Sequence, residues 1–420
     1  MSPQPFALIN LINLINPINP SDCGPILLEG RLFPDGRPVR IAVEDGRIAS
    51  VSPASRLDEP AGAERWIVPG FFDLQVNGFD GRSFAGPEVA IEDVEHIARA
   101  VLRTGTTRFL PTVISADLDT LCRQLSVLAE AIERNPLVRA MCPGIHLEGP
   151  FISPEDGPRG AHRRQFLRDP SIADYEKLHD AARGRMVMLT LSPERPGALE
   201  LIRHVASRGV VVALGHHRAD DETLEGAIAA GARVCTHLGN GSDAMLPRLA
   251  NYIWRQLGED RLWATFIADG HHLPAATLRC MLRAKGLERS ILVTDVNELA
   301  GMPPGRYTRR GGDAELTKDG KVVLAGTPYL AGSVATMPLL VANAVRHAGL
   351  AFPDAVRLAT LQPESLMRRY VTSWSCEPGQ SANVAQLDWY PTEPALHPRI
   401  TVIERFVSET EKLRRNPKTT

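Results

Sequence analysis

The chain has 420 residues, of which 44% are hydrophobic and 23% are charged, and its formal net charge is -2. This length accommodates one large domain or two, and the composition is that of an ordinary globular protein. The near-neutral charge excludes a strongly basic surface, so we expect no nucleic-acid partner. The six cysteines are scattered, with no CxxC pair, and we expect reduced thiols and a cytoplasmic location.

The first 23 residues do not have the pattern of a globular domain. Residues 8–19 interrupt pairs of apolar residues with Asn, which makes the segment too short and too polar to span a membrane. No basic region or small-residue cleavage site accompanies it. We therefore predict a poorly ordered leader over 1–23, with a signal peptide as the alternative, and no membrane partner.

Both ends of the remaining chain are predicted to be β structure. Short alternating apolar segments occupy 24–66, separated by Asp-Gly dipeptides that are typical of hairpins. A matching β segment occurs at 382–387 and 400–403. We predict that 24–66 and 376–408 form one small β-sandwich domain built from both chain ends, and that 409–420 is a flexible tail.

The middle of the chain, 67–375, alternates apolar runs with amphipathic helices such as 89–103. The runs are 66–77, 106–112, 141–148, 186–192, 210–216, 232–237, 262–269 and 290–295. Eight runs alternating with helices predict an α/β fold, a (β/α)8 TIM-like barrel. An open doubly wound sheet is the alternative, but the first run is not followed by the Gly-rich phosphate loop of such a sheet.

Polar and ionisable residues close most of these runs, and in a barrel the carboxyl ends of the strands line the active site. Glu148, His216 and His237 close three of the runs. Two imidazoles and a carboxylate suit a divalent metal such as zinc and leave a coordination position open, as in catalytic sites. Each histidine alone is better explained as a hydrogen-bonded core residue, but the set predicts a metal site.

Further residues at the same ends have candidate roles. Asp295 closes the eighth run, where a carboxylate beside the metal would accept and return a proton; the alternative is a turn cap. His272, which follows Asp269, is a candidate to hydrogen-bond a substrate carbonyl or hydroxyl. His146 shares a strand face with Glu148, so it is either a further ligand or a supporting residue behind the site.

A series of motifs runs in order between about residues 24 and 403. They are PGFFDLQVNG (69–78), HLEGPF (146–151), GAH (160–162), GH (215–216), THL (236–238), DGHH (269–272), LVTD (292–295) and LAGSVATM (330–337). As an ordered set they resemble the motifs of the N-acetylglucosamine-6-phosphate deacetylase family, within the amidohydrolase superfamily.

The resemblance implies a hydrolase acting on a linear amide C-N bond. In that family, water activated by the metal removes the acetyl group of N-acetylglucosamine 6-phosphate and leaves an amino sugar phosphate and acetate. The resemblance implies one divalent ion per subunit, zinc in the first place and iron, cobalt or another divalent ion as alternatives. Its ligands would be Glu148, His216 and His237, with Asp295 as base and acid and His272 stabilising the oxyanion.

The first barrel strand carries Gln75 and Asn77 where many amidohydrolases have an HxH pair. Amides are weak ligands, so the resemblance implies that the second metal site of those enzymes is vacant here. By matching motifs, the sugar would be contacted by Ala161, His162, Asn240, Gly241, His272, Leu330, Ala331 and Gly332.

The chain departs from the family over 236–245, where an aromatic residue is lost and residues are inserted. It also lacks the Arg-Glu-Pro-Gly segment whose arginine grips the sugar phosphate; Arg248 is the nearest replacement and Arg255 a weaker one. The resemblance further implies a homodimer. The alternatives are a deacylase of a different, unphosphorylated N-acyl amino sugar or other amide, and a non-catalytic sugar-binding relative.

Overall fold

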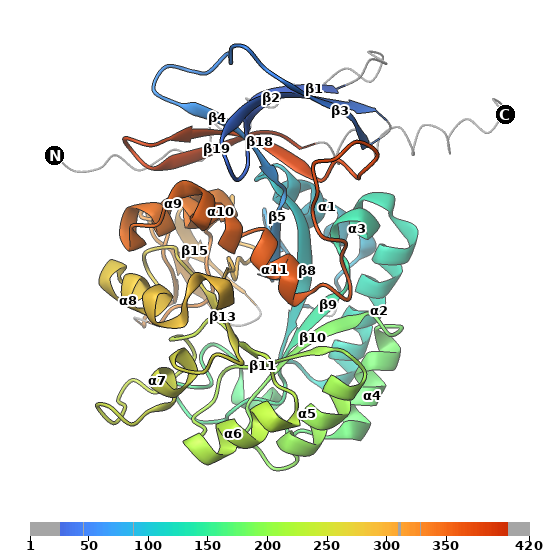
Figure 1. Cartoon of the computed structure of the whole chain (residues 1–420). Coiled ribbons are helices and arrows are strands. Elements are labelled where there is room, and N and C mark those ends of the chain that lie inside the picture. Colours follow the sequence, from blue (N-terminus) through green and yellow to red (C-terminus); the bar gives the residue numbers. More distant parts are fainter. Residues whose placement is uncertain (1–25, 45, 87, 310–311, 328, 402–420) are drawn as a thin grey trace, which may run out of the picture.

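The structure is a computed structural model, and it describes residues 26–401 except 45, 87, 310–311 and 328. The predicted leader over 1–23 and tail over 409–420 lie outside these residues. Figure 1 shows a sheet of blue and red strands above a barrel surrounded by helices. None of the described helices is both long and apolar enough to cross a membrane.

Eight parallel strands form the barrel, in the hydrogen-bonded order β14-β13-β12-β11-β10-β9-β8-β5. They are β5 (Phe71–Val76), β8 (Thr106–Ile114), β9 (Ile145–Glu148), β10 (Met186–Leu191), β11 (Val211–Leu214), β12 (Val234–Cys235), β13 (Trp263–Phe266) and β14 (Ser290–Leu292). A bridge between Val76 and Val296 links the carboxyl ends of β5 and the segment after β14, so the barrel is nearly closed. The predicted TIM-like barrel is confirmed, since each predicted run coincides with or overlaps one of these strands.

Helices cover the outside of the barrel (Figure 1). They are α1 (Ile91–Leu102), α2 (Leu118–Arg134), α3 (Pro136–Met141), α4 (Ile172–Ala181), α5 (Ala198–Ser207), α6 (Asp221–Ala230), α7 (Tyr252–Leu257), α8 (Ala275–Lys285), α9 (Met337–Ala348), α10 (Phe352–Leu358) and α11 (Leu361–Leu366). In α1 the apolar residues at helical spacing, Val94, Ile97 and Val101, are all buried. The side chain of Asp117 caps α2 by accepting from the Thr120 N–H, which satisfies one free donor of the first turn.

The two chain ends build the second sheet, in the order β19-β18-β4-β1-β2-β3. Its strands are β1 (Ile26–Leu32), β2 (Arg37–Glu44), β3 (Arg47–Pro53), β4 (Glu64–Pro69), β18 (Val384–Tyr390) and β19 (Ala395–Thr401). Leu28, Ile41, Ile48, Ile67 and Val384, from five different strands, share one buried cluster. The chain ends therefore build one six-stranded sheet with its own small core, where the sequence predicted a sandwich.

The first predicted run, 66–77, divides between the two bodies. β4 ends at Pro69 in the terminal sheet and β5 begins at Phe71 in the barrel, so the chain passes from one body to the other at Gly70, where the prediction placed the change after residue 66. A Cβ on Gly70 would lie 2.0 Å from the Thr107 hydroxyl oxygen. Only glycine lets the chain turn here without displacing β8.

Two small antiparallel sheets complete the described structure. β6 (Gly78–Phe79) pairs with β7 (Arg82–Ser83), and β15 (Gly305–Tyr307), β16 (Ala314–Leu316) and β17 (Val322–Leu324) form a three-stranded sheet. The latter lies between β14 and α9 in the chain. A bridge from Val323 to Leu330 ties the segment 330–332 to it.

Candidate active site

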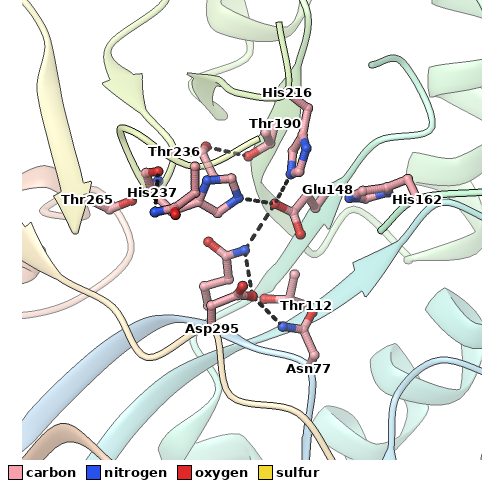
Figure 2. Close-up of polar contacts among 12 residues, drawn as sticks. Asn77, Thr112, Glu148, His162, Thr190, His216, Thr236, His237, Thr265 and Asp295 are labelled. Atoms are coloured by element: carbon pink, nitrogen blue, oxygen red, sulfur yellow. Dashed lines mark hydrogen bonds and ion pairs between the residues drawn. The ribbon is translucent and has the colours of Figure 1, made fainter. Parts of the chain in front are cut away.

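The carboxyl ends of the barrel strands bring four of the predicted residues together (Figure 2). Glu148 is the last residue of β9, while His216, His237 and Asp295 follow β11, β12 and β14 within three residues. These three have φ values of 55°, 30° and 50°, in the left-handed region that non-glycine residues rarely occupy. Such a backbone costs about 1–3 kcal/mol per residue and persists where the surrounding structure enforces it, often at functional sites.

One oxygen of Glu148 is the centre of the cluster. Its Oε1 lies 3.0 Å from His237 Nε2, 3.3 Å from His216 Nε2 and 3.0 Å from Gln75 Nε2, and the residue is only 3% exposed. Burial by itself raises the pKa of Glu148, but the hydrogen bonds and charges of the two histidines outweigh burial and hold the pKa well below its usual range. Glu148 is therefore a buried anion that requires partners.

The tautomer of His216 explains why a cation fits here. Its Nδ1 lies 2.8 Å from the Pro158 carbonyl oxygen, and because a carbonyl only accepts, Nδ1 carries the proton. When Nε2 carries no proton, its lone pair faces the Glu148 carboxylate oxygen, and when it carries one it donates to that oxygen. A divalent cation held by His216 and Glu148 would accept both lone pairs and remove their repulsion. The donor set fits a metal ion.

A third imidazole, that of His162, lies close to Glu148 and His216. The donor atoms of Glu148, His162 and His216 all lie within 4.8 Å of one another, whereas His237 reaches the cluster through its contact with Glu148. His162 is on the loop after β9, and its Nδ1 lies 2.8 Å from the Ser115 hydroxyl oxygen. The residues that close the predicted strands do not include His162, so the sequence pattern gives no sign that it lies near a metal site.

Gln75 and Asn77 join Asp295 to the cluster. Gln75 Nε2 lies 3.0 Å from Asp295 Oδ1 as well as 3.0 Å from Glu148, and Asn77 Nδ2 donates to Asp295 Oδ1 at 2.7 Å. Both amides thus donate N–H groups to carboxylates at the position of the predicted vacant second site. Burial and the charge of Glu148 raise the pKa of Asp295, which suits a group that must hold and release a proton.

His272 is oriented by Asp269, which follows β13. Its Nδ1 lies 2.7 Å from Asp269 Oδ2, and its backbone N–H donates to Asp269 Oδ1 at 2.9 Å. Burial opposes ionisation of Asp269, but the hydrogen bond from His272 lowers its pKa below the usual value. The carboxylate fixes the imidazole so that Nε2 is the nitrogen left for a ligand.

His146 lies deeper in the barrel than its neighbour Glu148. Its Nδ1 lies 3.1 Å from the Leu74 carbonyl oxygen and its Nε2 2.8 Å from the Thr190 hydroxyl oxygen. Thr190 in turn lies 2.9 Å from the Thr236 hydroxyl oxygen. Burial lowers the pKa of His146 to about 4, so the ring is neutral at pH 7. Both nitrogens are engaged by groups behind the site.

The predicted sugar contacts lie on loops around the cluster. A Cβ on Gly241 would lie 2.6 Å from His216 Nδ1, so only glycine fits there, and Asn240 Nδ2 donates to the His237 carbonyl oxygen at 3.1 Å. The Ala331 carbonyl oxygen accepts from Asn297 Nδ2 at 2.8 Å, beside Leu330 and Gly332. Ala161 is exposed and beside His162. These loops surround the cluster with backbone groups.

The two candidate phosphate arginines differ in their surroundings. Arg248 is exposed on the loop before α7. Arg255 is held in ion pairs with Glu225 and Glu259, both at distances below 3 Å. The structure therefore leaves Arg248, and not Arg255, available to an anionic ligand.

Asp73, on β5, is a buried carboxyl group that we expect to make the stability of the fold depend on pH. It is 2% exposed, and although Thr294 and the Gln75 N–H donate to it, burial raises its pKa from 3.8 to about 7. The folded protein thus retains a proton that the unfolded chain has already lost, so stability falls as pH rises from about 4 to about 7, by at most about 1.4 kcal/mol per pH unit. We expect urea unfolding of the metal-free protein between pH 5 and 7 to show this loss, and Asp73→Asn to show a flatter dependence. Parallel curves for the two proteins would contradict it.

Known proteins resemble the chain over most of its length. The profile of the amidohydrolase family matches residues 66–411. The N-acetylgalactosamine-6-phosphate deacetylase of Escherichia coli O157:H7 is 33% identical over 356 residues, which cover 84% of this chain and 91% of that protein. The N-acetylglucosamine-6-phosphate deacetylase of Homo sapiens is 34% identical over 361 residues, covering 81% and 82%.

A solved structure agrees with the described fold. A variant of the N-acetyl-D-glucosamine-6-phosphate deacetylase of Mycobacterium smegmatis, in complex with N-acetyl-D-glucosamine-6-phosphate, matches with a TM-score of 0.77 at 28% identity. The match covers 89% of this chain and 97% of that one.

Proposed function

This chain belongs to the amidohydrolase family, and we propose that it removes the acetyl group from an N-acetylated amino sugar 6-phosphate. The products are acetate and the amino sugar phosphate. The main support is that the Gln75 side chain hydrogen-bonds both Glu148, at the centre of the proposed metal site, and the carboxylate of Asp295. The relatives named as deacetylases of such sugars support it.

The metal is proposed to be zinc, held by Glu148, His216 and His237. Two imidazoles and one carboxylate are a frequent ligand set of catalytic zinc, although iron and cobalt accept the same donors. When bound, such an ion polarises the amide carbonyl and makes water more acidic. Gln75 and Asn77 direct N–H groups at carboxylates, which agrees with a single ion per subunit.

Asp295 is proposed as the group that moves the proton. Its Oδ1 is occupied by Gln75 and Asn77, which leaves Oδ2 to accept a proton from the attacking water. The raised pKa lets the same carboxyl group hand that proton to the departing amine nitrogen. His272, oriented by Asp269, would hydrogen-bond the carbonyl oxygen as negative charge develops on it.

The sugar is proposed to lie among the loops that carry His162, Asn240, Gly241 and 330–332, together with Ala161. Arg248 is the proposed phosphate contact, because it is exposed and the alternative, Arg255, is held in ion pairs. Relatives named for the glucosamine and the galactosamine epimers are about equally similar. The proposal therefore includes both configurations at C4 of the sugar.

Acetate release from a panel of sugars tests this proposal. We expect turnover of N-acetylglucosamine 6-phosphate or its galactosamine epimer, with kcat/KM about tenfold or more above that of the unphosphorylated sugar, because a charged contact is worth roughly 1.5–3 kcal/mol. Equal kcat/KM with and without the phosphate would remove the phosphate from the proposal and favour the alternative deacylase. Binding of these sugars without acetate release would favour a non-catalytic relative.

A homodimer is proposed from an exposed apolar surface beside Arg248. Met245 is 90% exposed, Leu249 79% and Trp254 51%, which is unusual for large apolar residues so close together in the chain. A second copy of the chain would cover this surface and bring Arg248 near another subunit.

The proposed location is the cytoplasm, where the described cysteines, all of them free, would stay reduced.

Sedimentation measures this dimer directly. We expect wild type at twice the 45.8 kDa chain mass and Leu249→Lys shifted toward the monomer, since a charge would be buried without a partner. Leu199→Lys, on an exposed apolar residue of α5, is the control and should leave the mass unchanged. A wild-type monomer would refute the dimer.

A further inference from the structure

His162 has the geometry of a metal ligand, although by family resemblance it contacts the sugar. Its donor atom lies within 4.8 Å of those of Glu148 and His216, and all three residues are buried. The His162 and His216 rings also lie edge to face, with centroids 4.6 Å apart. Figure 2 shows His162 on the side of Glu148 opposite His237.

The hydrogen bond to Ser115 orients this ring. Ser115 Oγ lies 2.8 Å from His162 Nδ1, so Nε2 is the nitrogen left for the cluster. Metal-bound histidines regularly hydrogen-bond through the ring nitrogen that does not bind the metal, which fixes the orientation of the ring. Gly149, with φ of 82°, makes room for the contact, because a Cβ there would lie 2.3 Å from Ser115 Oγ.

His162 differs from the other candidate ligands in the element that carries it. Glu148 ends a strand, and His216 and His237 follow strands directly, whereas His162 lies on the loop between β9 and the short 3-10 helix Arg164–Phe166. The loop is held by Arg159, whose Nη1 donates to the His162 carbonyl oxygen at 2.8 Å. A movement of this loop would take His162 out of the cluster and leave the barrel strands in place.

We propose that His162 is a fourth, displaceable protein ligand of the metal, present in the resting enzyme and replaced when substrate binds. The proposal rests on the metal site of the proposed function. The three strand-end ligands stay in place throughout. The hydrogen bond with Ser115 favours the return of His162 to the metal. The position that His162 occupies is then the one that must open for the amide.

X-ray absorption of the zinc-loaded protein counts the imidazoles bound to zinc. We expect three in the wild type and two in His162→Gln. In Asp295→Asn, addition of N-acetylglucosamine 6-phosphate should lower the count from three to two. A wild-type count of two would overturn the proposal, and a count that stays at three with the sugar bound would overturn displacement.

Zinc affinity, measured by competition with a chelating dye, gives a second readout. His162→Gln and Ser115→Ala should each weaken zinc binding, Ser115→Ala by about 10–100-fold because it removes the partner of a ligand. His271→Gln, on a partly exposed imidazole that contacts the Asp319 carbonyl oxygen, is the matched control and should bind zinc as wild type does. Unchanged affinity in both test variants would refute the proposal. None of these readouts requires acetate release, so failure of the proposed reaction is distinguished from failure of this inference.

Discussion

Asp295→Asn is expected to lower kcat by about 10²–10⁴-fold, the usual contribution of a positioned general acid and base. Asparagine retains the Oδ1 that accepts from Gln75 and Asn77. It also tolerates the left-handed backbone, φ 50° at this position, better than most residues. The substitution therefore replaces only the proton-accepting Oδ2 by an N–H group, so the zinc content should remain near that of wild type.

Steady-state acetate release and metal analysis of the same preparation test this expectation. Asp80→Asn is a matched control, because Asp80 is another described aspartate with a positive φ, 51°. It lies on the β6–β7 turn, where its Oδ2 is 3.2 Å from His96 Nε2. The control should retain wild-type turnover. An Asp295→Asn enzyme with undiminished kcat would remove Asp295 from the mechanism.

Glu148→Gln is expected to abolish tight metal binding and, with it, activity. Glu148 is the one anionic member of the proposed ligand set, and its Oε1 lies within 3.3 Å of both strand-end histidines. An amide is a weak ligand, and its N–H₂ group would face His216 or His237. Zinc should fall from about one ion per subunit to far below one after dialysis, as ligands must supply the electron pairs that hold the ion.

Glu155→Gln provides the comparison for this variant. Glu155 is exposed on the loop that follows the same strand, so the change removes one negative charge near the site without touching the cluster. It should bind zinc and release acetate as wild type does. Full zinc occupancy in Glu148→Gln after dialysis would show that the ligand set is misassigned.

The barrel could be predicted because its signal is local. Each parallel strand is covered on both faces, so it appears in the sequence as an apolar run between helical patterns. The residues that end those runs must converge in a barrel, which is why Glu148, His216, His237 and Asp295 could be grouped before any distance was known. The boundary at Gly70 was missed because it depends on the contact with Thr107, which is not a neighbour in sequence.

The details of the site depend on contacts between distant segments. His146 and Glu148 share a strand face, yet Leu74 and Thr190 hold the imidazole behind the site. Gln75 was predicted as a weak ligand, and only the fold shows that it joins Glu148 to Asp295. Partners of this kind lie 44 to 220 residues apart in the chain.

The sequence by itself therefore determined the barrel and the residue types at its strand ends. The apolar periodicity and the order of the strands are local features that residues close together in the chain specify. Tertiary structure alone decided which nitrogen of each imidazole faces Glu148, and that His162 reaches the cluster from a loop. Loops carry no periodic signal, and the direction of a side chain is set by whatever the fold packs against it. Ser115 and Pro158, which orient His162 and His216, become neighbours of these rings only when the barrel forms.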